Sequence, residues 1–527
     1  MRTNRFHPAL AAMLVCLTLT AHAQAPSSAP KIKVIKAGQL LDVTSGKLLR
    51  DQVIVVRDGL IESVGAATAV GIPAGAELVD LSAATVLPGL VDTHTHLTSD
   101  PTLPPYFGYG VSVPRLALKG AANARVTLLA GITTVRDVGA EGYSDIALRD
   151  AINDGDVPGP RILASGPALG ITGGHCDDNM LAPEFQHEAE GVANGPVEVR
   201  TVVRRNVKYG ADVIKYCGTG GVFSKGDTPG AQQYTAEEVT ALIDEAHMLG
   251  RRVAVHAHGA DGIKVAIRAG VDTVEHASLI DDEGLQLAKK AGTWLSMDIY
   301  NTDYTQSEGP KRGELEEFLR KDREVAQAQR DNFQKAVKAG IKLTFGTDAG
   351  VYRHGDNAKQ LAVMVRYGMT SLQALQAATL NGADALGLKG KIGNIAPGYA
   401  ADIIAVKNDP LADVRALEAV SFVMKAGEVY KEEGLLGTGL WAAGQSSEQE
   451  RLPFRSGQQP RAQYPAALLL QVLPIPSHVA LHPVAQVTWF AQAMKLLRVN
   501  DELGVDAGAA QRLVHLLRVQ QRYVEVA

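Results

Sequence analysis

Apolar strand segments that alternate with helical segments constrain the fold of this chain more than any other feature of its sequence. Eight stretches between residues 86 and 348 are rich in β-branched and other apolar residues, which is typical of buried strands. They span residues 86–96, 131–137, 161–165, 212–217, 252–258, 272–276, 294–298 and 342–348. Several intervening stretches have helical periodicity, for instance residues 235–249 and 314–339. Eight such units predict an α/β fold, a closed parallel (β/α)8 TIM barrel over residues 86–394.

Glycine residues mark the expected ends of the helices. A residue just past a helix end often adopts the left-handed conformation, which glycine accepts without strain. Six of the eight strands have a glycine at this position: Gly131, Gly210, Gly250, Gly270, Gly292 and Gly340. Thr235 and Glu238 have the spacing of a capping box, which indicates that a helix begins there.

The segments on either side of the barrel have strand character but no helical stretches between the strands. Residues 32–87 contain β-branched runs separated by turns, and residues 395–432 return to the same pattern. We infer that the two flanks pair with each other. The expected result is a small β-sandwich domain made of residues 24–85 and 395–432.

The first 23 residues have the composition of a secretory signal peptide. Arg2 and Arg5 precede an apolar stretch at residues 9–20, and the sequence Ala-His-Ala at residues 21–23 is a small-x-small cleavage site. The apolar stretch is too short for a good transmembrane helix. We therefore expect cleavage near Ala23 and export to a bacterial periplasm or to the exterior.

Residues 433–527 differ in pattern from the rest of the chain and contain no chemical motif. Residues 444–466 are rich in Gln, Ser, Pro and Arg, which is typical of a flexible segment. Two interpretations are open. The segment is either an appended tail or the translation product of a frameshift near Glu433.

Charge and cysteine content limit the possible partners. The net charge is −5, with 46% hydrophobic and 21% charged residues, so composition predicts neither a nucleic-acid partner nor a membrane partner. Cys176 and Cys217 are the only cysteines outside the expected signal peptide. Two cysteines in so long a chain do not make a disulfide framework, and the simplest interpretation is two small buried apolar side chains.

Potential metal ligands stand at the ends of the predicted strands. His94 and His96 end the first strand two residues apart, so their side chains point the same way. Four more such residues end other strands: Lys215, His256, His276 and Asp348. In a parallel barrel these ends converge on one face, where active sites lie. Four imidazoles and a carboxylate suit zinc or another first-row divalent ion.

The motifs that carry these residues resemble those of the amidohydrolase superfamily of metal-dependent hydrolases, over residues 32–432. The matching motifs are Pro88-Gly-Leu-Val-Asp-Thr-His-Thr-His96, Gly131-Ile-Thr-Thr-Val-Arg-Asp137, His256-Ala-His258, Glu275-His276 and Gly346-Thr-Asp348. In binuclear members of this superfamily, a lysine on the fourth strand reacts with carbon dioxide and bridges two metals as a carbamate. The resemblance therefore implies two divalent ions, with zinc expected, and a carboxylated Lys215.

The same resemblance divides the ligands between the two metals. It implies that His94, His96, Lys215 and Asp348 hold the first ion, and that Lys215, His256 and His276 hold the second. Two cations lower the pKa of a bridging water, so hydroxide exists near neutral pH. Asp348 is then expected to take the proton from that water and to deliver it to the leaving amine.

Further motifs resemble the branch that contains Xaa-Pro and Xaa-Arg dipeptidases and ochratoxin-hydrolysing amidases. They are Thr172-Gly-Gly-His175, Thr219-Gly-Gly-Val-Phe-Ser224, Pro229-Gly-Ala-Gln-Gln233 and Gly350-Val-Tyr-Arg-His-Gly-Asp-Asn357. This resemblance implies a secreted amidohydrolase that cleaves an amide C–N bond in a dipeptide or an N-acyl amino acid. Ochratoxin-type amides belong to that class, and relatives often assemble, so a homo-oligomer is expected.

Five other residues are candidates for substrate contacts. His175 and His354 could contact a substrate carbonyl or carboxylate, or could stabilise their own loops by hydrogen bonds. His258 could orient a ligand or the substrate. Tyr216 and Tyr352 could donate hydrogen bonds to a substrate carboxylate, with packed core aromatics as the alternative.

Two other functions remain open from the sequence. One is a different enzyme, a cyclic-amide hydrolase or a deaminase, and a single metal per chain would favour the deaminase. The other is a catalytically silent metal-binding or ligand-binding protein, against which the complete set of ligands argues.

Overall fold

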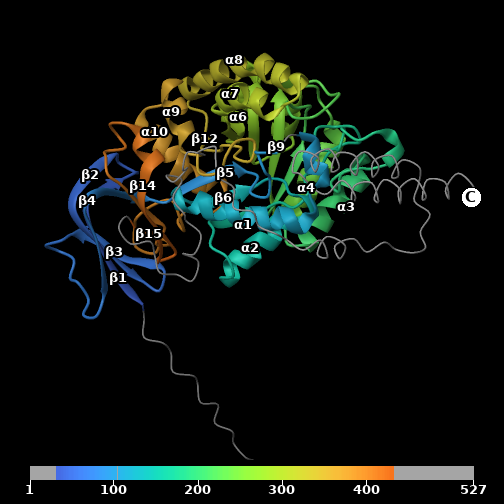
Figure 1. Cartoon of the computed structure of the whole chain (residues 1–527). Coiled ribbons are helices and arrows are strands. Elements are labelled where there is room, and N and C mark those ends of the chain that lie inside the picture. The colour runs from blue at the N-terminus through green and yellow to red at the C-terminus, as the bar shows by residue number, and fades with distance from the viewer. Residues whose placement is uncertain (1–30, 104, 433–527) are drawn as a thin grey trace, which may run out of the picture. The chain divides into compact units, whose positions relative to one another are not determined.

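A computed structural model of the chain describes residues 31–103 and 105–432 (Figure 1). The expected signal peptide at residues 1–23 and the segment 433–527 both lie outside the described residues. Among the helices of the described part, none is long and apolar enough to cross a membrane.

All eight strands predicted for the barrel are present, and they form two parallel sheets. The first sheet contains β5 (Leu90–Thr95), β6 (Ile132–Asp137) and β7 (Arg161–Ala164). The second contains β8 (Val213–Cys217), β9 (Arg252–Gly259), β10 (Thr273–Leu279), β11 (Trp294–Ser296) and β12 (Leu343–Thr344).

Backbone hydrogen bonds connect the two sheets at both pairs of edges. Beyond β7, Leu169 N donates to Lys215 O at 2.8 Å, and Cys217 N donates to Leu169 O at 2.8 Å. At the other pair of edges, Asp348 N donates to His94 O at 2.8 Å. The carboxyl ends of β5 and β8 are thus held to the segments that follow β12 and β7.

Helices separate consecutive strands of these sheets, and the last three helices follow β12. They are α1 (Val113–Leu129), α2 (Ser144–Asp154), α3 (Gly195–Lys208), α4 (Ala236–Met248), α5 (Ala260–Arg268), α6 (Asp282–Ala291), α7 (Asn301–Arg312), α8 (Glu316–Ala339), α9 (Lys359–Arg366), α10 (Ser371–Gln376) and α11 (Gly382–Ala385). Short 3-10 turns lie at η1 (Pro105–Gly110), η2 (Glu141–Tyr143), η3 (Pro183–Phe185) and η5 (Val414–Ala419), and a π-helical turn at η4 (Ala377–Asn381).

The local signals for helix ends are confirmed. All six glycines predicted to follow helices have positive φ angles, from 65° at Gly340 to 102° at Gly210. Thr235 Oγ1 accepts from Glu238 N, and the Glu238 carboxylate accepts from Thr235 N, so the capping box is formed. Apolar side chains of the helices and strands pack in one large core, for example Leu242 of α4 and Ile214 of β8. Burial of each such side chain stabilises the fold by about 1.5–3 kcal/mol.

The flanking segments form one antiparallel and parallel sheet of seven strands. Its strands are β1 (Ile32–Asp42), β2 (Lys47–Arg57), β3 (Leu60–Ala66), β4 (Glu77–Pro88), β13 (Ile403–Val406), β14 (Val420–Lys425) and β15 (Glu428–Glu432), in the order β15-β14-β13-β4-β1-β2-β3. The pairing of β4 with β13 joins the two flanks, as predicted. This pairing joins all seven strands in one continuous sheet, and the apolar face of that sheet packs on itself around Ile54, Ile403 and Phe422.

Gly89 divides the first predicted strand into two. Residues up to Pro88 belong to β4 of the seven-stranded sheet, and β5 of the parallel sheet begins at Leu90. A Cβ atom at position 89 would lie 2.2 Å from Thr133 Oγ1, so only glycine fits. The chain therefore passes from one sheet to the other at a single residue, immediately before the strand that carries His94.

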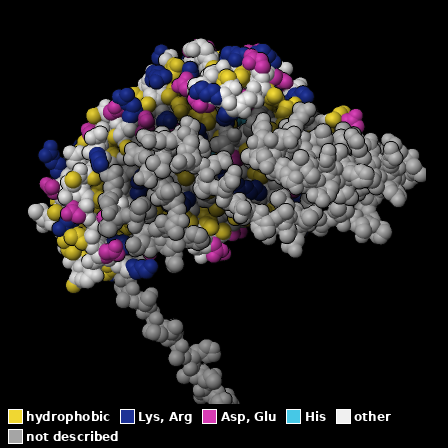
Figure 2. Space-filling view, in the orientation of Figure 1, with side chains coloured by type: hydrophobic (Ala, Val, Ile, Leu, Met, Phe, Trp, Pro, Cys, Tyr) yellow, Lys and Arg dark blue, Asp and Glu magenta, His cyan; other side chains and the backbone are white. Residues whose placement is uncertain are grey.

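Acidic and basic side chains are interspersed over the described part of the face drawn in Figure 2. This mixture agrees with the small net charge of −5. It gives the visible face no large field of one sign of the kind that attracts nucleic acid.

Candidate metal centre

The six predicted metal ligands meet at the carboxyl ends of the parallel strands. They line a cavity of about 750 Å³. His94 lies on β5 with His96 just beyond it, Lys215 lies on β8, His256 on β9 and His276 on β10, and Asp348 follows β12. Residues far apart in the sequence thus reach one site through the parallel strand order, as the positions of the strand ends predict.

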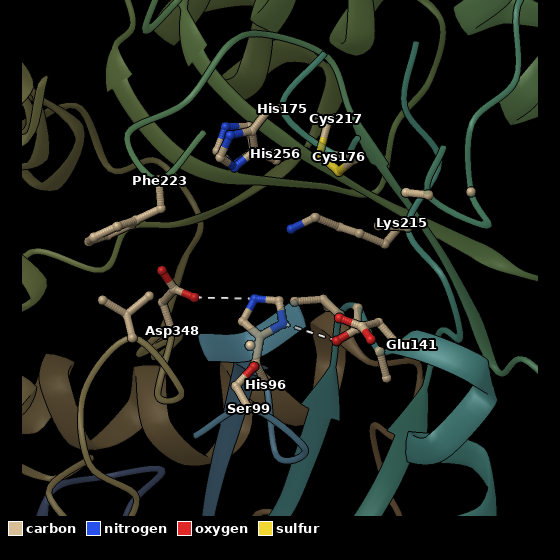
Figure 3. Close-up of a pocket in the computed structure, with 18 of the residues that line it drawn as sticks. His96, Ser99, Glu141, His175, Cys176, Lys215, Cys217, Phe223, His256 and Asp348 are labelled. Carbon is tan, nitrogen blue, oxygen red and sulfur yellow. Dashed lines mark hydrogen bonds and ion pairs between the residues drawn. A yellow bond between two sulfur atoms is a disulfide. The ribbon is translucent and has the colours of Figure 1, made fainter. Parts of the chain in front are cut away.

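One group of ligand atoms surrounds the Asp348 carboxylate. His94 Nε2 and His96 Nε2 each lie 3.3 Å from Asp348 Oδ1, and one of these contacts is drawn in Figure 3. The three ligand atoms lie within 4.8 Å of one another. Burial by itself would raise the pKa of Asp348, but the two histidines lower that pKa well below its usual value. Asp348 is therefore a carboxylate, the form that binds a metal.

A second group contains His256, His258 and His276, whose ligand atoms also lie within 4.8 Å of one another. His276 joins a third group with Asp298 and Asp348, so the ligand atoms form one continuous cluster. His256 Nε2 is buried and makes no hydrogen bond with any residue of the described ranges. A buried nitrogen without a partner is costly unless something else occupies it, and a divalent cation would do so.

The Lys215 side chain points into the space between these groups, as Figure 3 shows. Lys215 is 3% exposed, and its amine makes no hydrogen bond or ion pair with any described residue. Burial is the main reason that the pKa of Lys215 is lowered to about 8. About a tenth of this amine is therefore neutral at pH 7, far more than of an exposed lysine.

Hydrogen bonds from Nδ1 orient three of the histidine rings. His94 Nδ1 lies 3.0 Å from Glu275 Oε2, and His276 Nδ1 lies 2.9 Å from Asp298 Oδ1. His96 Nδ1 lies 3.2 Å from a backbone carbonyl oxygen. Carboxylates and carbonyls only accept, so Nδ1 donates in each case. The lone pair of Nε2 then faces the cavity, which is the arrangement that metal-binding histidines need.

A buried arginine supports this arrangement and has no role in the sequence-based prediction. Arg136 Nη2 donates to Glu275 Oε1 at 2.6 Å, and Arg136 Nε donates to Thr93 O at 2.6 Å. Burial would raise the pKa of Glu275, but Arg136 and His94 lower it below its usual value. The sequence could have indicated this pair, because Arg136 and Glu275 are charged residues inside apolar strands, and such side chains are rarely buried without a partner.

Asp298 and Asn301 are also absent from the predicted set. Asn301 Nδ2 donates to Asp298 Oδ2 at 2.6 Å and to Asp348 Oδ2 at 2.9 Å. Gln329 Nε2 donates to Asp298 Oδ1 at 2.9 Å. Asp298 ends the seventh predicted strand just as Asp348 ends the eighth. This equivalent position in the sequence could have identified Asp298 as a residue of the site. Asn301 and Gln329 lie on helices, where the sequence offers no such signal.

Of the five predicted substrate contacts, two reach the cavity. His175 and His258 line it, and His258 Nδ1 lies 2.8 Å from Ser278 Oγ. His354 does not line the cavity and contacts Thr127 Oγ1 and the backbone oxygen of His96. This contact corresponds to the loop-stabilising alternative.

The two predicted tyrosines also lie away from the cavity lining. Tyr216 is buried and packs near Tyr234, with 6.1 Å between the ring centroids. Tyr352 is buried against Tyr300 and Tyr304. Both are packed core aromatics, which is the alternative that the sequence leaves open.

The two cysteines form a disulfide, so the interpretation as separate apolar side chains is wrong. The Cα atoms of Cys176 and Cys217 are 5.9 Å apart, and the bond appears in Figure 3. It links the loop after β7 to the carboxyl end of β8, two residues beyond Lys215. Cysteine spacing could not reveal this contact, because it depends on which strands are neighbours.

Comparisons with known proteins agree with this geometry. The amidohydrolase family model matches residues 85–431. Ochratoxinase from Aspergillus niger is 32% identical over 449 residues, which cover 80% of this chain and 90% of that protein.

Solved structures give the same result. A Xaa-Pro dipeptidase with methionine bound in its active site is 38% identical with a TM-score of 0.71, and the match covers 76% of this chain and 100% of that one. The structure of the A. niger ochratoxinase is 31% identical with a TM-score of 0.68, covering 77% of this chain and 97% of that one.

Proposed function

The chain belongs to the amidohydrolase family, and from this premise we propose that it is a metal-dependent amidase that hydrolyses dipeptides or N-acyl amino acids. The observation that carries the proposal is Lys215, a buried amine without a partner among the described residues, which lies between two groups of potential metal ligands. The similarity to an ochratoxinase and to a Xaa-Pro dipeptidase supports an amide C–N bond as the target. Ochratoxin-type amides, in which an aromatic acid is joined to an amino acid, are within this class.

We propose that the site holds two divalent cations, with zinc as the preferred ion. His94, His96 and Asp348 would hold one ion, and His256 and His276 would hold the other. The neutral Lys215 amine would add carbon dioxide with release of one proton, and the resulting carbamate oxygens would serve both ions. Bound cations would supply an activated water and a polarised carbonyl.

Asp348 is the residue proposed to transfer the protons. Asp348 is an ionised carboxylate and can take the proton of the attacking water as general base. It can return that proton to the leaving amine, so that one water and one amide give one acid and one amine. Asn301 Nδ2 donates to Asp348 Oδ2 at 2.9 Å, which restrains rotation of this carboxylate during the transfer.

The fold and location of the protein are part of the same proposal. We infer that the eight parallel strands close into a (β/α)8 barrel, which the hydrogen bonds at both pairs of sheet edges support. We further propose export through residues 1–23 and a homo-oligomeric state. The Cys176–Cys217 disulfide supports export, because disulfides persist in oxidising compartments.

Purified protein of known metal content, screened against dipeptides and N-acyl amino acids, tests the function. We expect two metal ions per chain, turnover of at least one such amide, and no measurable turnover after Lys215→Ala or Asp348→Asn. Near-normal activity in either variant would refute the assignment. One ion per chain with deamination, and no amide hydrolysis, would favour the deaminase instead.

A further inference from the structure

His175 is a cavity residue whose neighbours determine which of its ring nitrogens carries the proton. Its ring stacks on that of His256 with 3.9 Å between the centroids, and Figure 3 shows the two rings together on one side of the cavity. His175 Nδ1 lies 2.7 Å from Ser224 Oγ. His175 Nε2 makes no hydrogen bond with any residue in the described ranges.

A buried ion pair sets the direction of the hydrogen bonds behind this ring. Lys321 Nζ lies 2.8 Å from Asp227 Oδ1, and the two side chains are only 2% and 7% exposed. An ammonium group only donates and a carboxylate only accepts. Ser224 Oγ lies 2.7 Å from the same carboxylate oxygen, so the serine hydroxyl donates its single proton to Asp227. Ser224 Oγ can therefore only accept from His175, and His175 Nδ1 carries the ring proton.

A second proton on Nε2 of His175 would have no acceptor among the described residues, and a charged ring without one is costly. The ring is therefore neutral, and the lone pair of Nε2 has no partner in the described protein. Two further contacts hold the backbone in place: Gln233 Oε1 accepts from His175 N at 3.0 Å, and Cys176 is tied to β8 by the disulfide. His175 is not among the described residues whose ligand atoms gather within 4.8 Å of one another. The ring is therefore a fixed acceptor beside the proposed metal ligands rather than one of them.

We propose that His175 accepts a hydrogen bond from an N–H group of the substrate, with Ser224, Asp227 and Lys321 as positioning residues that fix this acceptor. The proposal rests on the amide-hydrolase function and narrows its substrates to those with an N–H donor beside the scissile carbonyl. It replaces the expectation that His175 contacts a substrate oxygen, because a lone pair repels a carbonyl or carboxylate oxygen. A dipeptide offers two such donors, its terminal ammonium group and its amide N–H.

Four small compounds separate the two possible donors. Glycylphenylalanine has both, glycylproline has only the ammonium group, acetylphenylalanine has only the amide N–H, and acetylproline has neither. Each is measured as a substrate, or as a competitor of the best substrate, with wild type and with Ser224→Ala. Loss of one oriented hydrogen bond should raise KM or the inhibition constant about tenfold for compounds with the contacted donor, with little change in kcat.

The outcomes of this comparison are distinct. If Ser224→Ala raises KM or the inhibition constant for both glycyl compounds, the contacted donor is the ammonium group. If it raises that constant for both phenylalanine compounds, the contacted donor is the amide N–H. Acetylproline should be unaffected, and Ser224→Thr, which keeps the hydroxyl, should restore wild-type values. An equal change for all four compounds, or a loss of bound metal in Ser224→Ala, would overturn the proposal. Ser421→Ala is the matched control, because it removes a buried hydroxyl of β14 that donates to Ala405 O in β13.

A second measurement does not depend on activity or on the folding of the serine variant. In protein labelled with [15N]histidine, His175→Phe keeps a ring to stack on His256 and removes one set of imidazole signals. We expect those signals to be those of a neutral ring with the proton on Nδ1. A ring with the proton on Nε2, or with both nitrogens protonated, contradicts the inference even if no amide is hydrolysed. Absence of all amide turnover in wild type, with the expected tautomer present, would instead count against the proposed function alone.

Discussion

The side chain of Lys215 shows how burial can prepare a residue for chemistry. A buried ammonium group without a partner is costly, so the neutral amine is favoured and the pKa falls to about 8. Only the neutral amine can add carbon dioxide. Above the lowered pKa the amine is mostly free base, and below it the amine is mostly cationic. The reactive fraction of Lys215 therefore rises with pH through this value.

This dependence predicts the pH profile of metal reconstitution. With metal-free protein, zinc and a fixed concentration of dissolved carbon dioxide, the reconstitution rate should rise about tenfold between pH 7 and pH 9, following the neutral fraction of a group with a pKa near 8. Regain of activity after mixing measures this rate. Omission of carbon dioxide is the control and should slow the recovery at every pH. A rate that is independent of both pH and carbon dioxide would show that Lys215 is not carboxylated.

Glu275 supports the site from behind the ligands, because it joins Arg136 to His94. In Glu275→Gln, the buried Arg136 loses its ion pair, which costs about 3–5 kcal/mol of unfolding free energy. Glutamine keeps a single carbonyl oxygen for the two donors. When Arg136 takes that oxygen, His94 Nδ1 is left without an acceptor, so metal affinity should fall about 10-fold to 100-fold. Denaturant unfolding and zinc titration measure the two effects.

The pKa of Glu275 is lower in the folded protein than in the unfolded chain. The ionised Glu275 therefore stabilises the fold at pH values above its unfolded pKa, and this contribution is lost as the pH falls through its pKa in the folded protein. Glu62→Gln is the matched control, since Glu62 forms an exposed ion pair with Arg57 in the seven-stranded sheet. Exposed pairs contribute less than about 1 kcal/mol. Similar losses of unfolding free energy in Glu275→Gln and Glu62→Gln would contradict the role given to Glu275.

At the scale of elements, the segment between β8 and α4 passes so close to the site that Gly221 has no room for a side chain. A Cβ atom on Gly221 would lie 2.3 Å from His175 Cε1 and 2.7 Å from His256 Nε2. Gly221→Ala should therefore displace both rings and lower kcat/KM at least about 100-fold, as misplacement of ligating groups by about 1 Å does. Steady-state kinetics and bound zinc measure the effect.

The control for this substitution is Gly71→Ala. A Cβ atom at Gly71 meets nothing within 4 Å, so activity and stability should stay close to wild type. Circular dichroism should show that both variants keep the wild-type secondary structure. Full activity in Gly221→Ala would show that the two rings can move without consequence.

Elements of this kind also show what the sequence can and cannot predict. The strands and the glycines that follow the helices were predictable, because apolar runs and left-handed helix ends depend on local sequence. The last strand is shorter than predicted, since β12 ends at Thr344 and the following residues turn toward the site. The ion pair of Arg136 with Glu275 and the Cys176–Cys217 disulfide were not predictable, because each joins segments that become neighbours only through the strand order.

The same limit applies to the choice of face. Tyr216 lies on β8, and Tyr352 and His354 lie in the loop after β12, but the side chains of all three lie outside the cavity lining. Side chains on a strand alternate between two faces, and a shift by one residue turns a side chain from cavity to core. Lys215 and Tyr216 are adjacent residues of β8 and show this alternation directly.

At the scale of the whole molecule, the site draws its ligands from segments that span most of the described chain, from His94 to Asp348. Metal bound as proposed would therefore connect β5, β8, β9, β10 and the segment after β12. A ligand that binds only the folded state stabilises it in proportion to the logarithm of its concentration over its Kd, about 4 kcal/mol at a thousandfold excess. Without metal, His256 Nε2 stays buried and unpartnered, which weakens the same region.

Metal removal is thus expected to lower stability as well as activity. Dialysis against a chelator should abolish amide hydrolysis and lower the Tm by several degrees, and added zinc should restore both values. The shift should grow with free zinc concentration in wild type and be much smaller in Asp348→Asn, which lacks an ionised ligand. Magnesium at the same concentration is the ionic control, because imidazole ligands favour zinc over magnesium. A Tm that does not respond to zinc while activity does would mean that the metals hold the reacting groups without stabilising the fold.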